Sequence, residues 1–218
     1  MTELRYTLLS DGSSDRALIP ILTWLLRRYL PCCAIQSAWA DLRRLPSPPK
    51  GLAARIDSSI DLYPCDLLFI HRDAESASRD QRVQEIEQAK GNGCWAKRPS
   101  VCVIPVRMTE AWLLFDEAAI RRASGNPNGK VQLCLPPDVE SIPDPKRCLR
   151  ELLLEASGLS DGRQKRFQVE RAALRVSEHA GNFSALRNLQ AFAALENDLA
   201  QTLGDTPWLL TSPAGAGS

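Results

Sequence analysis

The chain of 218 residues has 27 basic and 26 acidic side chains, a net charge of +1 and 44% hydrophobic residues, as expected for one substantial globular core. This balance of charges excludes a protein held to nucleic acid by its overall charge. The sequence has no apolar run of membrane-spanning length and no signal-peptide pattern, so we expect a cytoplasmic protein without membrane contact. The seven cysteines form no Cys-x-x-Cys pair and only two histidines accompany them, which argues for reduced thiols and against zinc.

The first half of the sequence alternates segments typical of strands and helices. Apolar or β-branched runs predict the strands, and apolar residues three and four apart predict the helices. The predicted strands and helices are, in order, 5–9, 18–30, 34–39, 52–60, 66–71, 80–90 and 100–106. This alternation predicts an α/β fold, a doubly wound and mostly parallel sheet with helices on both faces.

The central strand of this sheet is predicted from the run Leu67 to Ile70. Its four apolar residues follow one another without alternation, as in a strand buried on both faces. Pro105 indicates that the strand 100–106 either lies near an edge of the sheet or ends there, because proline cannot donate to a central ladder.

The second half of the sequence is predicted to be mainly helical. Thr109 is placed to cap a helix, and four prolines make Gly125–Asp144 an irregular excursion, a candidate lid or partner surface. We therefore divide the chain into an α/β core at 1–124, the excursion at 125–144, a helical region packed on the core at 145–210 and a disordered tail at 211–218.

Acidic residues follow three of the predicted strands. Asp11 and Asp15 follow the first, Asp73 and Glu75 the central strand, and Glu110 the last. Because parallel strands end at the same edge of a sheet, these carboxylates are expected to meet there and to hold a hard cation, Mg²⁺ or Mn²⁺. The alternative for each acid is a helix cap or a solvated charge, and for the central pair a polar loop neutralised by neighbouring arginines.

The motif S-D-G-S-S-D at the first strand and R-D-A-E at the central strand resemble the TOPRIM domain of topoisomerases, bacterial primases and OLD-type nucleases. Asp11 falls on the family's glutamate, Asp15 on the acid that follows it, and Asp73 and Glu75 on its Asp-x-Asp pair. The segment 104–116, I-P-V-R-M-T-E-A-W-L-L-F-D, resembles small stand-alone bacterial TOPRIM proteins that are encoded beside an ATPase in phage-defence loci. Asp11 is one methylene shorter, and Glu75 one longer, than the family residues.

This resemblance implies phosphodiester cleavage in nucleic acid with Mg²⁺ or Mn²⁺. Asp11, Asp73 and Glu75 would hold the metal, and Asp15 and Glu110 would complete the catalytic set, Glu110 as a further ligand or as a proton acceptor.

Arginines adjacent to these acids are candidates for contacting nucleic acid. Arg16, Arg72 and Arg107 would line its path, although salt bridges to the same acids are an equal alternative. His71 is more typical of a structural residue at a strand end, and the basic run Arg163 to Arg175 of a solvated helix face.

Two functions follow from the resemblance. The first is a metal-dependent nuclease that acts as the effector of an anti-phage system with an ATPase partner of the ABC or AAA type. The second is a TOPRIM-like scaffold or regulator of such an ATPase without catalysis, which the shortened side chain at Asp11 favours. A phosphoreceiver is a third alternative, and the chain has no Walker A motif of its own.

Overall fold

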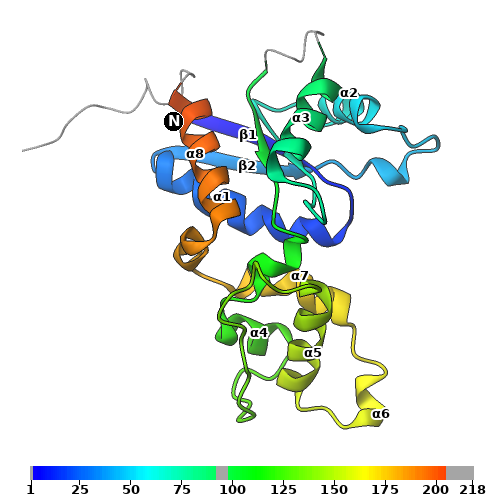
Figure 1. Cartoon of the computed structure of the whole chain (residues 1–218), viewed down its shortest axis with the longest axis vertical. Coiled ribbons are helices and arrows are strands. Elements are labelled where there is room, and N and C mark those ends of the chain that lie inside the picture. The colour runs from blue at the N-terminus through cyan, green and yellow to red at the C-terminus, as the bar shows by residue number, and fades with distance from the viewer. Residues whose placement is uncertain (1, 92–97, 205–218) are drawn as a thin grey trace, which may run out of the picture.

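The computed structural model describes residues 2–91 and 98–204, and the predicted tail at 211–218 lies outside them. Within these residues four parallel strands form one sheet with the order β2-β1-β3-β4. The strands are β1 (Thr2–Leu9), β2 (Cys33–Trp39), β3 (Leu67–His71) and β4 (Ser100–Val103). The predicted doubly wound parallel α/β fold is therefore confirmed (Figure 1). Strand β4 is an edge strand, and it ends at Val103, before Pro105.

The register of the strands sets which side chains meet on each face. Leu8 of β1 lies beside Phe69 of β3, and Phe69 beside Val101 of β4, so these three residues share one face. Leu9 and Ile70 lie beside each other on the opposite face. All five residues of β3 are buried, as the uninterrupted apolar run predicted.

Helices cover both faces of the sheet (Figure 1). The face that carries Leu8 and Phe69 packs on α1 (Leu18–Tyr29) and α8 (Gln190–Gly204), in one large apolar cluster. The face that carries Leu9 and Ile70 packs in a smaller cluster on Ile56 and Ile60 of α2 (Leu52–Leu62) and Ile86 of α3 (Arg79–Lys90).

The remaining helices lie at the end of the molecule below the sheet in Figure 1. They are α4 (Glu117–Ala123), α5 (Pro145–Ser157), α6 (Asp161–Gln164) and α7 (Val169–His179). The large apolar cluster continues into α4, α5 and α7, and the edge-to-face contact of Trp112 with Phe192 of α8 lies within it. No helix in the two described ranges has both the length and the apolar composition needed to cross a membrane.

In the described part of the chain, four short 3₁₀ helices connect these elements. They are η1 (Ser14–Ala17), η2 (Leu42–Arg44), η3 (Thr109–Leu113) and η4 (Ser184–Asn188). Two of them bear on the site, because η1 follows β1 and η3 follows β4. The long helix predicted to start at Thr109 is thus split into η3 and α4, since the side chain of Asp116 caps a new helix at the backbone N–H of Ala119.

The excursion at 125–144 is irregular but more closely packed than predicted. Leu133 and Val139 are buried in the large apolar cluster. Glu140 accepts hydrogen bonds from the backbone N–H groups of Gln190 and Ala191 and so satisfies the N-terminus of α8. These contacts tie the segment to the core at Leu133, Val139 and Glu140, while most of its other residues are exposed. Its role as a lid or partner surface stays a prediction.

Candidate metal centre

The candidate site lies where the chain leaves β1 and β3. These neighbouring strands lead into α1 and α3, which cover opposite faces of the sheet. Such a switch in direction opens a crevice at the carboxyl ends of the strands, where open α/β sheets bind their ligands. The topology therefore directs attention to the two loops that hold Asp15 and Asp73.

Asp15 is turned into the protein by the tight loop that follows β1. Its residue is only 4% exposed, and its carboxylate accepts the backbone N–H of Gly12 at 2.7 Å. Helix α7 packs against η1, which carries Asp15, and holds the turn from the other side. This acid, four residues beyond Asp11, is thus the member of the first loop that reaches the site.

His71 ends β3 and lies between two carboxylates. Its Nδ1 is 3.4 Å from Asp15 Oδ2, and its Nε2 is 3.1 Å from Asp73 Oδ1. Thr109 joins the group from η3: its hydroxyl is 2.9 Å from His71 Nε2, and its backbone N–H donates to Asp73 Oδ1 at 3.0 Å. Three loops therefore converge on one imidazole ring.

The charges in this cluster are strongly coupled. Burial acts to lower the pKa of His71, but the close polar contacts and negative charges of Asp15 and Asp73 outweigh it and raise the pKa to about 9. Burial likewise acts to raise the pKa of Asp15, but His71, the Gly12 N–H and Thr109 hold it below its usual value. Without a metal ion, His71 is thus an imidazolium at neutral pH, and a cation that bound its ring nitrogen would displace that proton.

The same three residues offer the donor set of a metal site. One ligand atom each from Asp15, His71 and Asp73 lies within 4.8 Å of the others. His71 Nδ1 is buried without a hydrogen-bond partner, since its contact with Asp15 is an ion pair without hydrogen-bond alignment. The Asp73 side chain is 29% exposed, whereas that of His71 is 0%, so Asp73 forms the approach from solvent. These observations fit a divalent cation with mixed nitrogen and oxygen ligands.

Two residues with left-handed backbone conformations join the loops that follow β3 and β4. Glu75 and Arg107 have φ angles of 53° and 62°, and the N–H of Glu75 donates to the carbonyl of Arg107 at 3.1 Å. For residues with a Cβ this conformation costs about 1–2 kcal/mol each. The strain is typical of a functional loop, and here it fixes Asp73 relative to Thr109.

The structure places Asp11 and Glu75, both predicted metal ligands, apart from this cluster. Asp11 Oδ1 is 2.5 Å from Arg55 Nη1 of α2, and its Oδ2 is 3.1 Å from Arg72 Nε. The Glu75 side chain is largely exposed and lies 3.5 Å from Arg82. Asp73 is thus the residue of the predicted metal set that contributes to the group of ligands, and Asp15, predicted only as catalytic, contributes a second carboxylate.

Glu110, the last predicted catalytic acid, is buried beside the cluster. Burial raises its pKa, and the negative charges of Asp73 and Asp15 add to this effect, while Lys146 opposes it. Glu110 and Lys146 line a pocket of about 210 Å³ together with Ser13 and Ser14 of the β1 loop. A carboxyl group in this position holds a proton more readily than one in water, as a general acid or base requires.

The three predicted nucleic-acid arginines differ in their surroundings. Arg72 is bound to Asp11 and Glu85, which is the salt-bridge alternative. Arg107 is exposed. Arg16 lies over the ring of Trp39, at 5.4 Å from its centroid, and lines a pocket at the surface with Arg171 and Arg175 of α7.

Sequence analysis missed two members of the cluster. His71 was assigned a structural role, although a histidine that ends a fully buried strand beside Asp73 is a recognisable signal. Thr109 was assigned as a helix cap, and no sequence pattern distinguishes a cap from a hydroxyl that contacts a histidine 38 positions away. Comparisons of the chain with protein-family models, curated proteins and solved structures found no match.

Proposed function

We propose that this protein is a metal-dependent nuclease whose cation binds between Asp15, His71 and Asp73. The observation that carries the proposal is the buried donor set itself, with its ligand atoms within 4.8 Å at the switch point of a parallel sheet. An imidazole beside two carboxylates suits Mn²⁺ better than Mg²⁺, which prefers oxygen ligands alone.

In this proposal each neighbouring side chain has a defined task. A cation held by Asp15, His71 and Asp73 would supply Lewis-acid chemistry to the phosphodiester and to an attacking water. Glu110, whose pKa is raised by burial, would take a proton from this water as the water oxygen bonds to phosphorus. The ester P–O bond breaks, and the leaving oxygen takes a proton from solvent. Thr109 keeps His71 and Asp73 in place through its hydroxyl and its backbone N–H. Arg16 binds a phosphate of the substrate at the adjoining surface.

The biological setting is part of the same proposal. The resemblance of the first-strand and central-strand motifs to TOPRIM nucleases supports a cytoplasmic effector that acts with an ATPase of the ABC or AAA type against phage. In such a system the ATPase would trigger cleavage, so the isolated chain is expected to be less active than the complex.

The second candidate is a scaffold or regulator of the ATPase without catalysis. Two observations favour it. Asp11, which falls on the family's glutamate, is neutralised by Arg55 and Arg72. The imidazolium of His71 also balances Asp15 and Asp73 without a metal ion.

Metal binding and cleavage, measured with matched variants, separate the two. Titration with Mn²⁺ followed by electron paramagnetic resonance should show a site that Asp73→Asn removes and that Asp61→Asn, at an exposed position of α2, retains. With Mn²⁺ and the ATPase partner present, labelled DNA and RNA should be cut by the wild type and by Asp61→Asn, but not by Asp73→Asn. Equal cutting by the wild type and Asp73→Asn, or no Mn²⁺ binding by the wild type, would reject the nuclease.

A further inference from the structure

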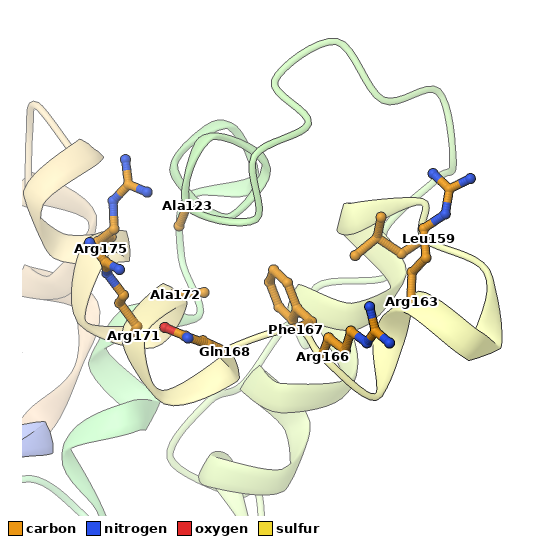
Figure 2. Close-up of a pocket in the computed structure, with 9 residues that line it drawn as sticks. All are labelled: Ala123, Leu159, Arg163, Arg166, Phe167, Gln168, Arg171, Ala172 and Arg175. Carbon is orange, nitrogen blue, oxygen red and sulfur yellow. The ribbon is translucent and has the colours of Figure 1, made fainter.

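A hollow lined by four arginines lies at the surface of the helical end of the molecule. Arg163, Arg166, Arg171 and Arg175 surround a pocket of about 560 Å³, and no carboxylate lines it. Figure 2 shows two of these arginines on either side of the hollow, with Phe167 between the pairs. The basic run that sequence analysis assigned to a solvated helix face therefore forms a concave site.

These arginines are not used in holding the fold together. All four are exposed, and among the described residues none of their guanidinium groups has an ion-pair partner. Arg171 and Arg175 are four positions apart on α7, so they project from the same side of that helix. Gathering four like charges without counter-charges is unfavourable for the protein alone, which points to an anionic ligand with several charges.

The walls between the arginines favour a strand with unstacked bases. Phe167 is partly exposed and Gln168 is exposed, while Leu159 and Ala172 supply apolar surface. An aromatic face within a basic groove is the arrangement by which proteins bind single-stranded nucleic acid, because bases stack on the ring while arginines contact the phosphates. A regular duplex would offer phosphates to the arginines but no base to Phe167.

The hollow shares two arginines with a second pocket at the surface. Arg171 and Arg175 line this second pocket together with Arg16, and Glu178 is the acid among its lining residues. Arg16 directly follows Asp15 of the metal cluster, and α7 packs against the 3₁₀ helix that carries both. One basic path thus connects Arg163 to the residue beside the metal ligand.

We propose that the arginine hollow binds single-stranded nucleic acid and guides it along Arg171, Arg175 and Arg16 to the metal centre. The assignment as a substrate path rests on the proposed nuclease function. The binding itself is independent of cleavage and is tested without metal.

The test measures binding of fluorescein-labelled single-stranded DNA and RNA oligonucleotides to the full chain in EDTA by fluorescence anisotropy. Removing two phosphate contacts in Arg163→Gln/Arg166→Gln should weaken binding about 25-fold at 0.1 M salt and reduce the log–log salt slope by about 1.4. Arg171→Gln/Arg175→Gln should have a similar effect. The matched control is Arg27→Gln/Arg28→Gln, two exposed arginines at the far end of α1, which should behave as the wild type.

Phe167→Ala tests the stacking separately. It should weaken single-strand binding about fivefold or more without changing the salt slope, and should leave duplex binding unaffected.

Equal losses in the control and in the hollow variants would overturn the proposal, as would equal losses for duplex and single strand in Phe167→Ala. Displacement of the oligonucleotide by inorganic phosphate or a mononucleotide at micromolar concentration would assign the hollow to a small phosphate ligand and overturn it too. If binding depends on the arginines but the protein does not cleave with Mn²⁺, the proposed binding site stands and only the nuclease function is rejected.

Discussion

Replacing His71 by glutamine should remove most of the pH dependence of stability that this protein shows between neutral and alkaline pH. The side chain of His71 is fully buried between Asp15 and Asp73. Glutamine keeps a hydrogen-bond donor of similar size but cannot carry the positive charge that balances the two carboxylates. The metal-free protein in EDTA is the form in which this effect is to be measured.

The magnitude follows from the shift in the pKa of His71. Folding raises this pKa from 6.5 to about 9, which at about 1.4 kcal/mol per unit corresponds to about 3 kcal/mol. Because the pKa is higher in the folded state, the stabilisation is fully present below pH 6.5 and is lost as the pH rises through about 9. The free energy of unfolding of the wild type should therefore fall by about 3 kcal/mol across this window.

Urea denaturation at pH 6 and at pH 9.5, followed by circular dichroism, checks this expectation. The half-buried thiol of Cys102, whose pKa is raised by burial to about 11, also lowers stability at alkaline pH, but it does so in both proteins. The difference between wild type and His71→Gln therefore isolates the imidazole. It should be about 3–5 kcal/mol at pH 6, as for a broken buried ion pair, and much smaller at pH 9.5. The same difference at both pH values would refute the assignment of an imidazolium.

Three further outcomes are expected. Mn²⁺ at about 100 times its dissociation constant should stabilise the wild type by about 2.7 kcal/mol in thermal melts, and Asp73→Asn should abolish this shift; an equal shift in the variant would place the ion elsewhere. Thr109→Val, which removes the hydroxyl 2.9 Å from His71 Nε2, should lower the free energy of unfolding by about 1–2 kcal/mol in urea denaturation, and no loss would show that the hydroxyl is dispensable. Glu140→Ala should cost about 1 kcal/mol by the same measurement, because two N–H groups at the start of α8 lose their acceptor; an unchanged midpoint would mean that water replaces it.

The sequence by itself determined the layers of the fold. The run Leu67 to Ile70 places apolar side chains on both faces of a strand, and these leave water only if both faces are covered. The run therefore predicted a central strand between layers of helices. Pro105 indicated that the last strand lies at an edge or ends there, and the alternation of strands and helices predicted a parallel sheet. These features depend on apolar periodicity and backbone geometry, which are local properties and can be read along the chain.

Only the tertiary structure decided which polar side chains meet. Asp11 and Asp15 lie in one loop and have the same chemistry, yet Asp15 turns inward to His71 whereas Asp11 turns outward to Arg55, 44 positions away. The choice depends on partners that β3, α2 and η3 bring to the loop, and no local pattern encodes their positions. The same holds for Thr109 and for the four arginines of the hollow, whose grouping depends on how the chain turns between α6 and α7. Side-chain hydrogen bonds and ion pairs act over a few ångströms, so their assignment follows from the packed fold.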